Sequence, residues 1–90
     1  MKFEWDSEKS RANKEKHGID FETAQNLWLD ENRIEIETPY PVEKRNIIIA
    51  KFLGKLWTAV YTIRSETVRI ISVRRSRKKE VKLYVKEKIS

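Results

Sequence analysis

The sequence predicts an α+β fold in which two N-terminal helices precede a four-stranded antiparallel sheet and a C-terminal helix ends the chain. Three observations support this order. Apolar residues recur at helical spacing in roughly the first third of the chain, alternate with polar ones from Arg33, and return to helical spacing after Ser76. A chain of 90 residues is long enough for one small core, so we expect a single domain spanning 1–90.

Two capping residues mark the starts of the two N-terminal helices. Asp6 is a suitable N-cap for a helix that runs to about Lys16, and Gly18 supplies the left-handed stop. KFEW, before this helix, is a candidate short strand. Asp20 caps a second helix, FETAQNLWL. Its apolar face should join the core through Phe21, Ala24, Leu27 and Trp28.

The four strands follow from alternation and short connections. RIEIET alternates, PYP then interrupts as a loop, and RNIIIAKF and LWTAVYTI flank Gly54 as a hairpin. ETVRIISV follows as the fourth strand. Such short connections leave no room for crossovers, so these strands should pair in sequence and antiparallel.

The last helix begins near Ser76 and has an apolar stripe of Val81, Tyr84, Val85 and Ile89. Five positive charges crowd its N-terminal end, which already carries a partial positive charge. They are Arg74, Arg75, Arg77, Lys78 and Lys79. This crowding is unfavourable for an isolated fold and would be tolerable if a phosphodiester normally occupied the site.

Charge is also divided unevenly along the chain. Residues 1–43 hold 6 Lys/Arg and 11 Asp/Glu, whereas residues 44–90 hold 14 and 3. The halves therefore carry −5 and +11. A basic half of this kind suits a polyanion such as RNA, although a merely solvated basic surface is the plainer interpretation.

Composition argues against several classes of function. With one His, no Cys and few acids in the basic half, a metal site or a nucleophilic triad is not expected. Two glycines exclude a glycine-rich phosphate loop, so we expect no cofactor. The longest apolar run, Ile47 to Ala50, is far too short to span a membrane, and the N-terminus lacks a signal-peptide core. We expect a cytoplasmic protein.

Arginines near strand ends are the first candidates for a site. Arg64 ends the third strand, while Arg69 and Arg74 lie on the fourth. Arg74 immediately precedes the last helix, where free N–H groups and guanidinium forks together could bind a phosphate. We expect Arg64 and Arg74 to hold one phosphate jointly.

Four other side chains have two possible roles each. Imidazole ordinarily changes charge near neutral pH, so His17 is a candidate acid or base, although its place before Gly18 also suits a helix cap. Glu80 could take part in catalysis or orient an arginine, and Tyr84 could take part in catalysis or belong to the core. Trp57 could stack on an RNA base or pack in the core.

Several segments in order resemble the BrnT family of toxins from bacterial type II toxin–antitoxin pairs. They are FEWD, KHGI, VYTIR and RIISVRRS, followed by Glu80 and Tyr84. The resemblance covers nearly the whole chain. It implies a RelE-like α+β fold, metal-independent RNA cleavage that inhibits translation, and neutralisation by a cognate BrnA-like antitoxin. It also suggests a complex of two toxins and two antitoxins.

The resemblance carries site residues over one by one. His17 lies in the matching KHG, Arg64 closes the third-strand motif, and Arg74, Glu80 and Tyr84 match C-terminal positions. Ile63 departs from the family pattern, which usually has Glu before the strand-end Arg. Such a site could run transesterification by the ribose 2′-OH, with Arg64 and Arg74 stabilising the phosphoryl oxygens.

Two other functions remain open at the level of sequence. One is a nucleic-acid-binding module without catalysis, and the other is a protein-interaction domain with a solvated basic face. For RNA binding the candidates are Arg69, Arg75, Arg77, Lys78, Lys79 and Trp57.

Overall fold

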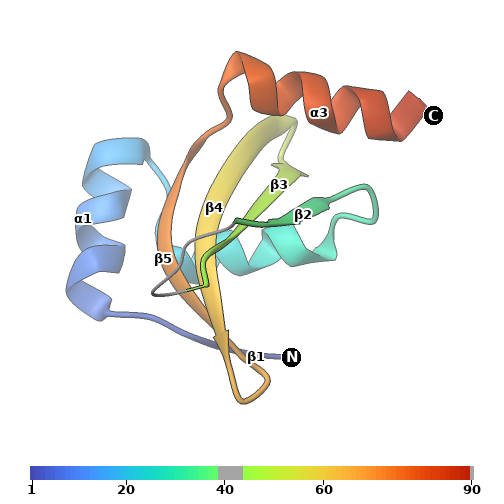
Figure 1. Cartoon of the computed structure of the whole chain (residues 1–90). Helices are drawn as coiled ribbons and strands as arrows, with labels where there is room; N and C mark the ends of the chain where they lie inside the picture. Colours follow the sequence, from blue (N-terminus) through green and yellow to red (C-terminus); the bar gives the residue numbers. More distant parts are fainter. Residues whose placement is uncertain (39–43, 90) are drawn as a thin grey trace.

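The computed structural model describes residues 1–38 and 44–89, which form a twisted sheet with helices around it (Figure 1). The expected PYP loop, 39–41, lies outside the described residues. The α+β class is confirmed. No helix among the described residues is long and apolar enough to cross a membrane.

The first helix, α1 (Ser7–His17), has the two ends that the sequence predicts. The Asp6 carboxylate accepts hydrogen bonds from the N–H groups of Glu8 and Lys9, at 2.9 and 3.1 Å. Gly18 has a φ of 82° and donates its N–H to the carbonyl of Lys14. The left-handed residue therefore ends the helix directly after His17.

The predicted second helix is only partly α-helical. Its first turn is α2 (Phe21–Ala24), and it continues as the 3₁₀ helix η1 (Gln25–Leu29). The side-chain amides of Gln25 and Asn26 donate to the carbonyls three residues earlier, at 3.1 and 2.8 Å. These bonds compete with α-helical ones, which explains the tighter turn.

The C-terminal helix, α3 (Lys78–Ile89), begins two residues later than predicted. The Glu80 carboxylate accepts the backbone N–H of Arg77 at 2.7 Å. This contact is the carboxylate half of a capping box, because Glu80 is the third helical residue after Arg77. The cap therefore fixes the start of α3 at Lys78 and leaves Ser76 outside it.

Five strands form the sheet, in the order β1-β5-β4-β3-β2. They are β1 (Lys2–Glu4), β2 (Ile34–Glu37), β3 (Asn46–Phe52), β4 (Lys55–Arg64) and β5 (Thr67–Arg75). The strands β2 to β5 pair antiparallel in chain order, as predicted.

The prediction of a four-stranded sheet is wrong, because β1 adds a fifth strand parallel to β5. Phe3 pairs with Val68, and its ring packs edge-on to Trp28 with centroids 5.1 Å apart. A three-residue strand has too little periodicity to reveal its pairing. Its partner is also more than sixty positions away, so no short connection indicates the contact.

One face of the sheet packs against α1, α2 and η1 and holds the core (Figure 1). The core residues are Ile19, Phe21, Ala24, Leu27, Trp28, Ile48, Ala50, Trp57, Ala59, Tyr61, Val68, Ile70 and Val73. Side chains alternate between the faces of a strand, so Thr58 and Arg74 point to the opposite face. The helix α3 crosses that face at one end, against β3 and β2.

Asn13 joins α1 to the outer edge of β5. Its side-chain amide donates to the carbonyls of Ile19 and Val73, at 2.8 and 2.9 Å, and its oxygen accepts the Val73 N–H at 3.2 Å. The strand β1 pairs with β5 only from Thr67 to Arg69, so this edge needs other partners. The Asn13 amide thus continues the ladder where β1 has ended.

Candidate nucleic-acid interface

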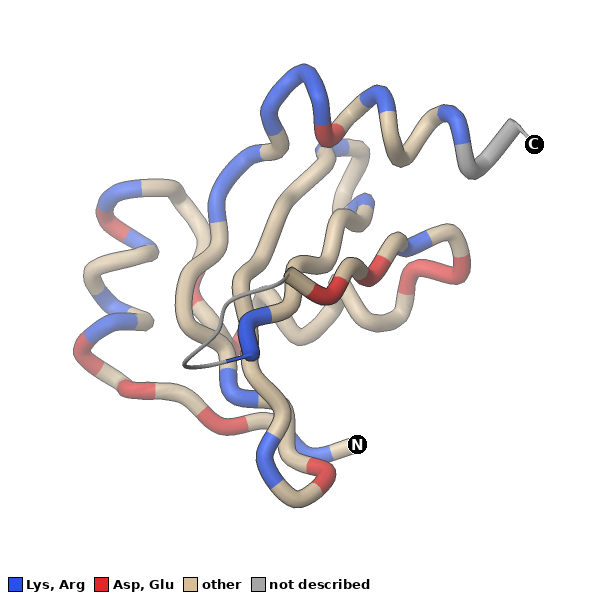
Figure 2. Tube along the Cα trace, viewed as in Figure 1, with Lys and Arg blue, Asp and Glu red and all other residues tan. Residues whose placement is uncertain are grey.

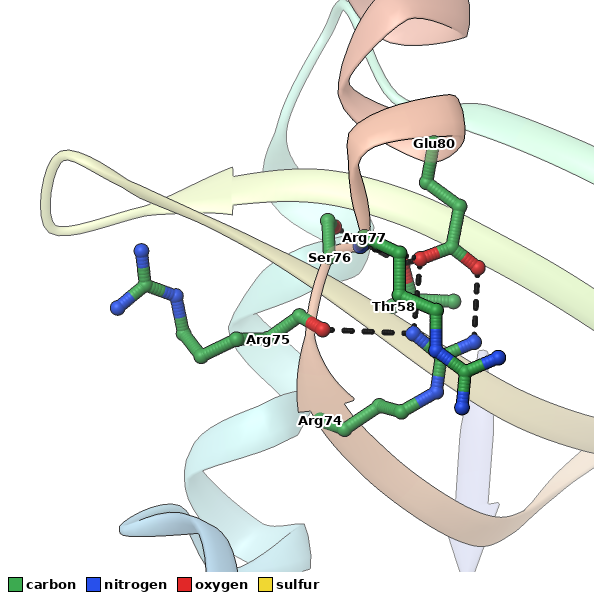
Figure 3. A network of polar contacts seen from close by, with 6 residues as sticks. All are labelled: Thr58, Arg74, Arg75, Ser76, Arg77 and Glu80. Carbon is green, nitrogen blue, oxygen red and sulfur yellow. Dashed lines mark hydrogen bonds and ion pairs between the residues drawn. The ribbon is translucent and has the colours of Figure 1, made fainter.

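The end of β5 and the start of α3 are joined by a polar network around Glu80 (Figure 3). Arg74 donates from Nη1 to Oε1 and from Nη2 to Oε2 of Glu80, both at 2.8 Å. Oε1 also accepts the Thr58 hydroxyl at 3.0 Å. With the Arg77 N–H, the carboxylate has four donors from β4, β5 and the helix cap.

These donors change the acid–base chemistry of Glu80. The Arg74 guanidinium, then the Arg77 N–H and the Thr58 hydroxyl, lower the pKa of Glu80 from 4.5 to about 2, against the raising effect of burial. A carboxylate of this kind is a weak base. Its geometry instead fixes the plane of the Arg74 guanidinium, so Glu80 positions Arg74.

Arg74 keeps two N–H groups for other partners. Nη1 also donates to the Arg75 carbonyl at 3.3 Å, so both of its hydrogens are engaged, whereas the bond to Glu80 uses one of the two hydrogens of Nη2. Within the part of the chain that the structure describes, no hydrogen bond involves its Nε. The Nε–H and the second Nη2–H are therefore the donors that Arg74 can offer to an anion.

A basic surface surrounds this network, and Figure 2 shows Lys and Arg following one another from the end of β5 into α3. We define the junction cluster as Arg74, Arg75, Arg77, Lys78 and Lys79. Three of its members, with Glu80, line an open hollow of about 420 Å³. They are Arg77, Lys78 and Lys79. The structure thus brings five predicted residues together around one helix start.

Arg75 points away from the Glu80 network (Figure 3). Its guanidinium carbon lies 5.5 Å from the centroid of the Trp57 ring, and its Nε donates to the Leu56 carbonyl at 3.3 Å. Trp57 is only 8% exposed and belongs to the core. Of its two possible roles, the structure supports the core role, with Arg75 covering the ring.

Arg64 lies at the other end of the sheet. In the β4–β5 pair, Arg64 faces Thr67 whereas Arg74 faces Thr58, six residues further back along β4. At about 3.3 Å per residue, the two arginines are roughly 20 Å apart. The expectation that they hold one phosphate jointly is wrong. Two consecutive antiparallel strands run in opposite directions, so their C-terminal residues lie at opposite ends of the strand pair.

Arg69 and Ile63 also lie toward the end of the sheet where Arg64 lies. Arg69 faces Thr62 and is 3.8 Å from the Glu4 carboxylate, which partly neutralises it. Ile63 is 57% exposed beside Arg64. A glutamate at position 63 would therefore lie near Arg64 and could not reach Arg74.

His17 and Tyr84 are separated from Arg74 in different ways. His17 is half-buried at the end of α1, which covers the face opposite to the one where Arg74 points. Tyr84 is 3% exposed, and its hydroxyl donates to Oδ2 of Asp30 at 2.8 Å. Burial, followed by this bond to Asp30, raises the pKa of Tyr84 to about 12. Both features favour a structural role for Tyr84.

Thr58 and Asn13 are two polar residues that sequence reasoning missed. Thr58 is 1% exposed and completes the Glu80 network, and Asn13 ties α1 to β5. A weak signal existed for Asn13. With Ser10 it forms an i, i+3 pair on a helix too polar to pack through apolar side chains.

Metal-ligating groups do not gather in the described part of the chain, where no set of three or more His, Cys, Asp or Glu is close enough to hold an ion. The junction cluster presents cationic side chains. Their chemistry is the binding of anionic oxygens.

A small α+β fold with an arginine-rich junction between its last strand and last helix has the chemistry that suits an anionic partner. Residues 5–80 match the model of a family described as the ribonuclease toxin BrnT of type II toxin–antitoxin systems. The match covers most of the chain, which therefore belongs to the BrnT family. The family implies a ribonuclease toxin with an antitoxin partner. A comparison with curated proteins gives no match.

Proposed function

We propose that this chain is a metal-independent endoribonuclease toxin that binds RNA across the junction cluster. The observation that supports this most is the Arg74 guanidinium, held by two 2.8 Å bonds to Glu80, with its Nε–H and one Nη2–H left for an anion. Three exposed cations follow it around an open hollow. A charged donor fixed in place before the substrate arrives stabilises developing negative charge without reorganisation.

The proposed reaction is attack of a ribose 2′-OH on the adjacent phosphorus. The 2′-OH gives its proton to a base, the O2′–P bond forms, the P–O5′ bond breaks, and the 5′-oxygen receives a proton. The products are a 2′,3′-cyclic phosphate and a 5′-hydroxyl. The arginines of the junction cluster bind the phosphoryl oxygens, where charge accumulates.

We assign proton transfer to His17, which requires the reacting phosphate to lie around the end of β5, where Arg74 reaches it from one face of the sheet and α1 from the other. Glu80 is engaged by Arg74 with a pKa of about 2, and the buried Tyr84 hydroxyl is bonded to Asp30. Imidazole is suited to both proton steps because it ordinarily titrates near neutral pH. Arg75 shares a strand face with Val73, which belongs to the core on the side of the sheet that α1 covers, and its guanidinium lies over the Trp57 ring on that side.

The two arginines toward the other end of the sheet are assigned a role in binding RNA and none in catalysis. By the strand spacing given above, Arg64 lies roughly 20 Å from Arg74, and Arg69, on the same strand as Arg74, lies roughly 17 Å from it. At these distances they would bind the backbone of a neighbouring stretch of the same RNA. Such contacts raise affinity in a salt-dependent way and do not enter the transition state.

The cellular role follows from the family. Cleavage of RNA in the cytoplasm would stop translation, and a BrnA-like antitoxin would neutralise the toxin in a complex with two copies of each protein. The strongly basic half of the chain, +11 over residues 44–90, supports a partner that either competes with RNA or covers its surface.

A nucleic-acid-binding module without catalysis is the second candidate. One observation favours it: Glu80, the carboxylate beside Arg74, is engaged by four donors and is a weak base. This candidate predicts the same salt-sensitive affinity, so affinity does not distinguish the two.

Cleavage distinguishes them. Purified chain is incubated with single-stranded RNA in excess chelator, and the ends of the products are analysed by mass. We expect 2′,3′-cyclic phosphates from the wild type and a strongly reduced rate from His17→Gln, with Lys16→Gln as the control on the same helix. Binding without products from the wild type would instead establish the second candidate.

A further inference from the structure

The hairpin between β3 and β4 holds a leucine where a leucine is unfavourable. Phe52 pairs with Lys55, so Leu53 and Gly54 form a two-residue turn, with φ values of 50° and 78°. Turns of this type ordinarily have Asn, Asp or Gly in the left-handed positions. Leu53 is also 83% exposed. An apolar side chain in a strained backbone position at the tip of a hairpin suggests a binding role.

Leu53 stands between two hollows in the surface. The first, of about 470 Å³, is lined by Leu29, Lys51 and Tyr84. The second, of about 350 Å³, is lined by Lys14 and Lys55. Leu53 and Phe52 line both hollows, so we call these two residues the Leu53 ridge. Leu29 is 77% exposed, so apolar surface continues across the first hollow.

Positive charge surrounds this apolar ridge. Lys14, Lys51 and Lys55 are exposed around the two hollows. The acid of the first hollow, Asp30, is already engaged. Its carboxylate accepts hydrogen bonds from the backbone N–H groups of Lys51 and Asn32, at 2.8 and 2.9 Å, and from the Tyr84 hydroxyl at 2.8 Å. The lysines are therefore left to attract an external anionic partner.

We propose that the Leu53 ridge binds an acidic, amphipathic segment of the antitoxin. Apolar side chains of that segment enter the two hollows, and its carboxylates pair with the surrounding lysines. RNA fits this surface less well, because phosphates gain nothing from Leu53 and Leu29. The assignment rests on the proposed function in one respect: it takes the neutralising partner of a type II toxin as the occupant.

The main test uses Leu53→Asn, because asparagine tolerates left-handed backbone better than leucine. The probe is the purified antitoxin that neutralises this chain in cells, titrated calorimetrically into each full-length variant. We expect at least tenfold weaker binding together with an equal or higher melting temperature. This combination separates lost contact from lost folding.

Charge reversal tests the lysine rim, and the opposite hairpin provides a control. Lys51→Glu with Lys55→Glu should weaken antitoxin binding at least tenfold and reduce its dependence on salt. Ile63→Thr removes exposed apolar surface from the β4–β5 hairpin and should leave the affinity unchanged.

RNA cleavage by the same free variants keeps the two proposals distinct. Leu53→Asn should cleave RNA like the wild type while escaping neutralisation. Wild-type antitoxin affinity in both the Leu53 and lysine variants would overturn the ridge as the docking surface and leave the ribonuclease assignment intact. If Leu53→Asn lost RNA affinity and kept antitoxin affinity, the ridge would be an RNA surface, which also overturns the proposal.

Discussion

Arg74 and Glu80 form a bidentate ion pair that links the last strand to the last helix, with both N–O distances at 2.8 Å. The pair is largely shielded, since the side chains are 25% and 15% exposed. It raises the pKa of Arg74 and lowers that of Glu80. The same ion pair therefore holds α3 against β5 and fixes the orientation of the Arg74 guanidinium, which the proposed site needs.

Glu80→Gln should destabilise the protein in a pH-dependent way. A carboxylate whose pKa falls from 4.5 to about 2 on folding stabilises the folded state fully above pH 4.5, and this stabilisation is lost as the pH falls toward 2. We expect a loss on the order of 2 kcal/mol at pH 7, discounted for partial exposure. Urea unfolding of wild type and variant at pH 7, 5 and 3 measures it.

The difference between the two proteins should shrink between pH 4.5 and pH 2. Glu31→Gln, in an exposed turn, serves as the matched control and should show little difference at any pH. A gap between wild type and Glu80→Gln that stayed constant down to pH 2 would show that the ion pair is not its source.

Asn13→Ala should destabilise the fold by about 3 kcal/mol. The variant leaves the Val73 N–H and carbonyl without their side-chain partner at a buried edge, and each such group costs about 1–3 kcal/mol. Asn13→Asp should also destabilise, because it keeps the acceptor and loses the donor. Thermal unfolding checks both, with Lys16→Ala on the exposed side of α1 as the control. Equal melting temperatures for wild type and Asn13→Ala would contradict the edge-capping role.

Tyr84→Phe should cost about 1 kcal/mol and leave RNA cleavage unchanged, because the hydroxyl donates to Asp30 in a buried contact. The folded-state pKa of about 12 lies above the ordinary value of 10, so this stabilisation is present below pH 10 and is lost between pH 10 and 12. Unfolding at pH 8 and 11 measures it. A large fall in the cleavage rate with stability retained would assign Tyr84 to catalysis.

Local signals predict most of the fold. Asp6, Gly18 and Asp20 mark helix ends because their chemistry acts within a few residues. Alternation of apolar residues indicates β2, and apolar stretches with short connections between them indicate β3 to β5. The pairing of β1 with β5 depends on residues far apart in the chain, such as Phe3 and Val68. No periodicity or connection length encodes such a contact.

In the candidate site, too, only the features that depend on neighbouring residues could be predicted from the sequence. The basic residues around the start of α3 are neighbours in sequence, and the structure brings them together. Arg64 is ten positions from Arg74. Strand direction and register decide at which end of the sheet each arginine lies. Thr58 reaches Glu80 only because β4 pairs with β5, so residue type alone gave no sign of it.

The rate of RNA cleavage by Arg74→Lys, compared with Arg64→Lys, tests the central claim most directly. Lysine keeps the charge beside Glu80 but lacks the planar fork, and removing one such donor lowers rates about 100-fold or more. With excess protein in chelator, and with folding confirmed by circular dichroism, we predict that loss for Arg74→Lys and a near wild-type rate for Arg64→Lys. The reverse order would contradict the account and move the active site to the β4–β5 hairpin.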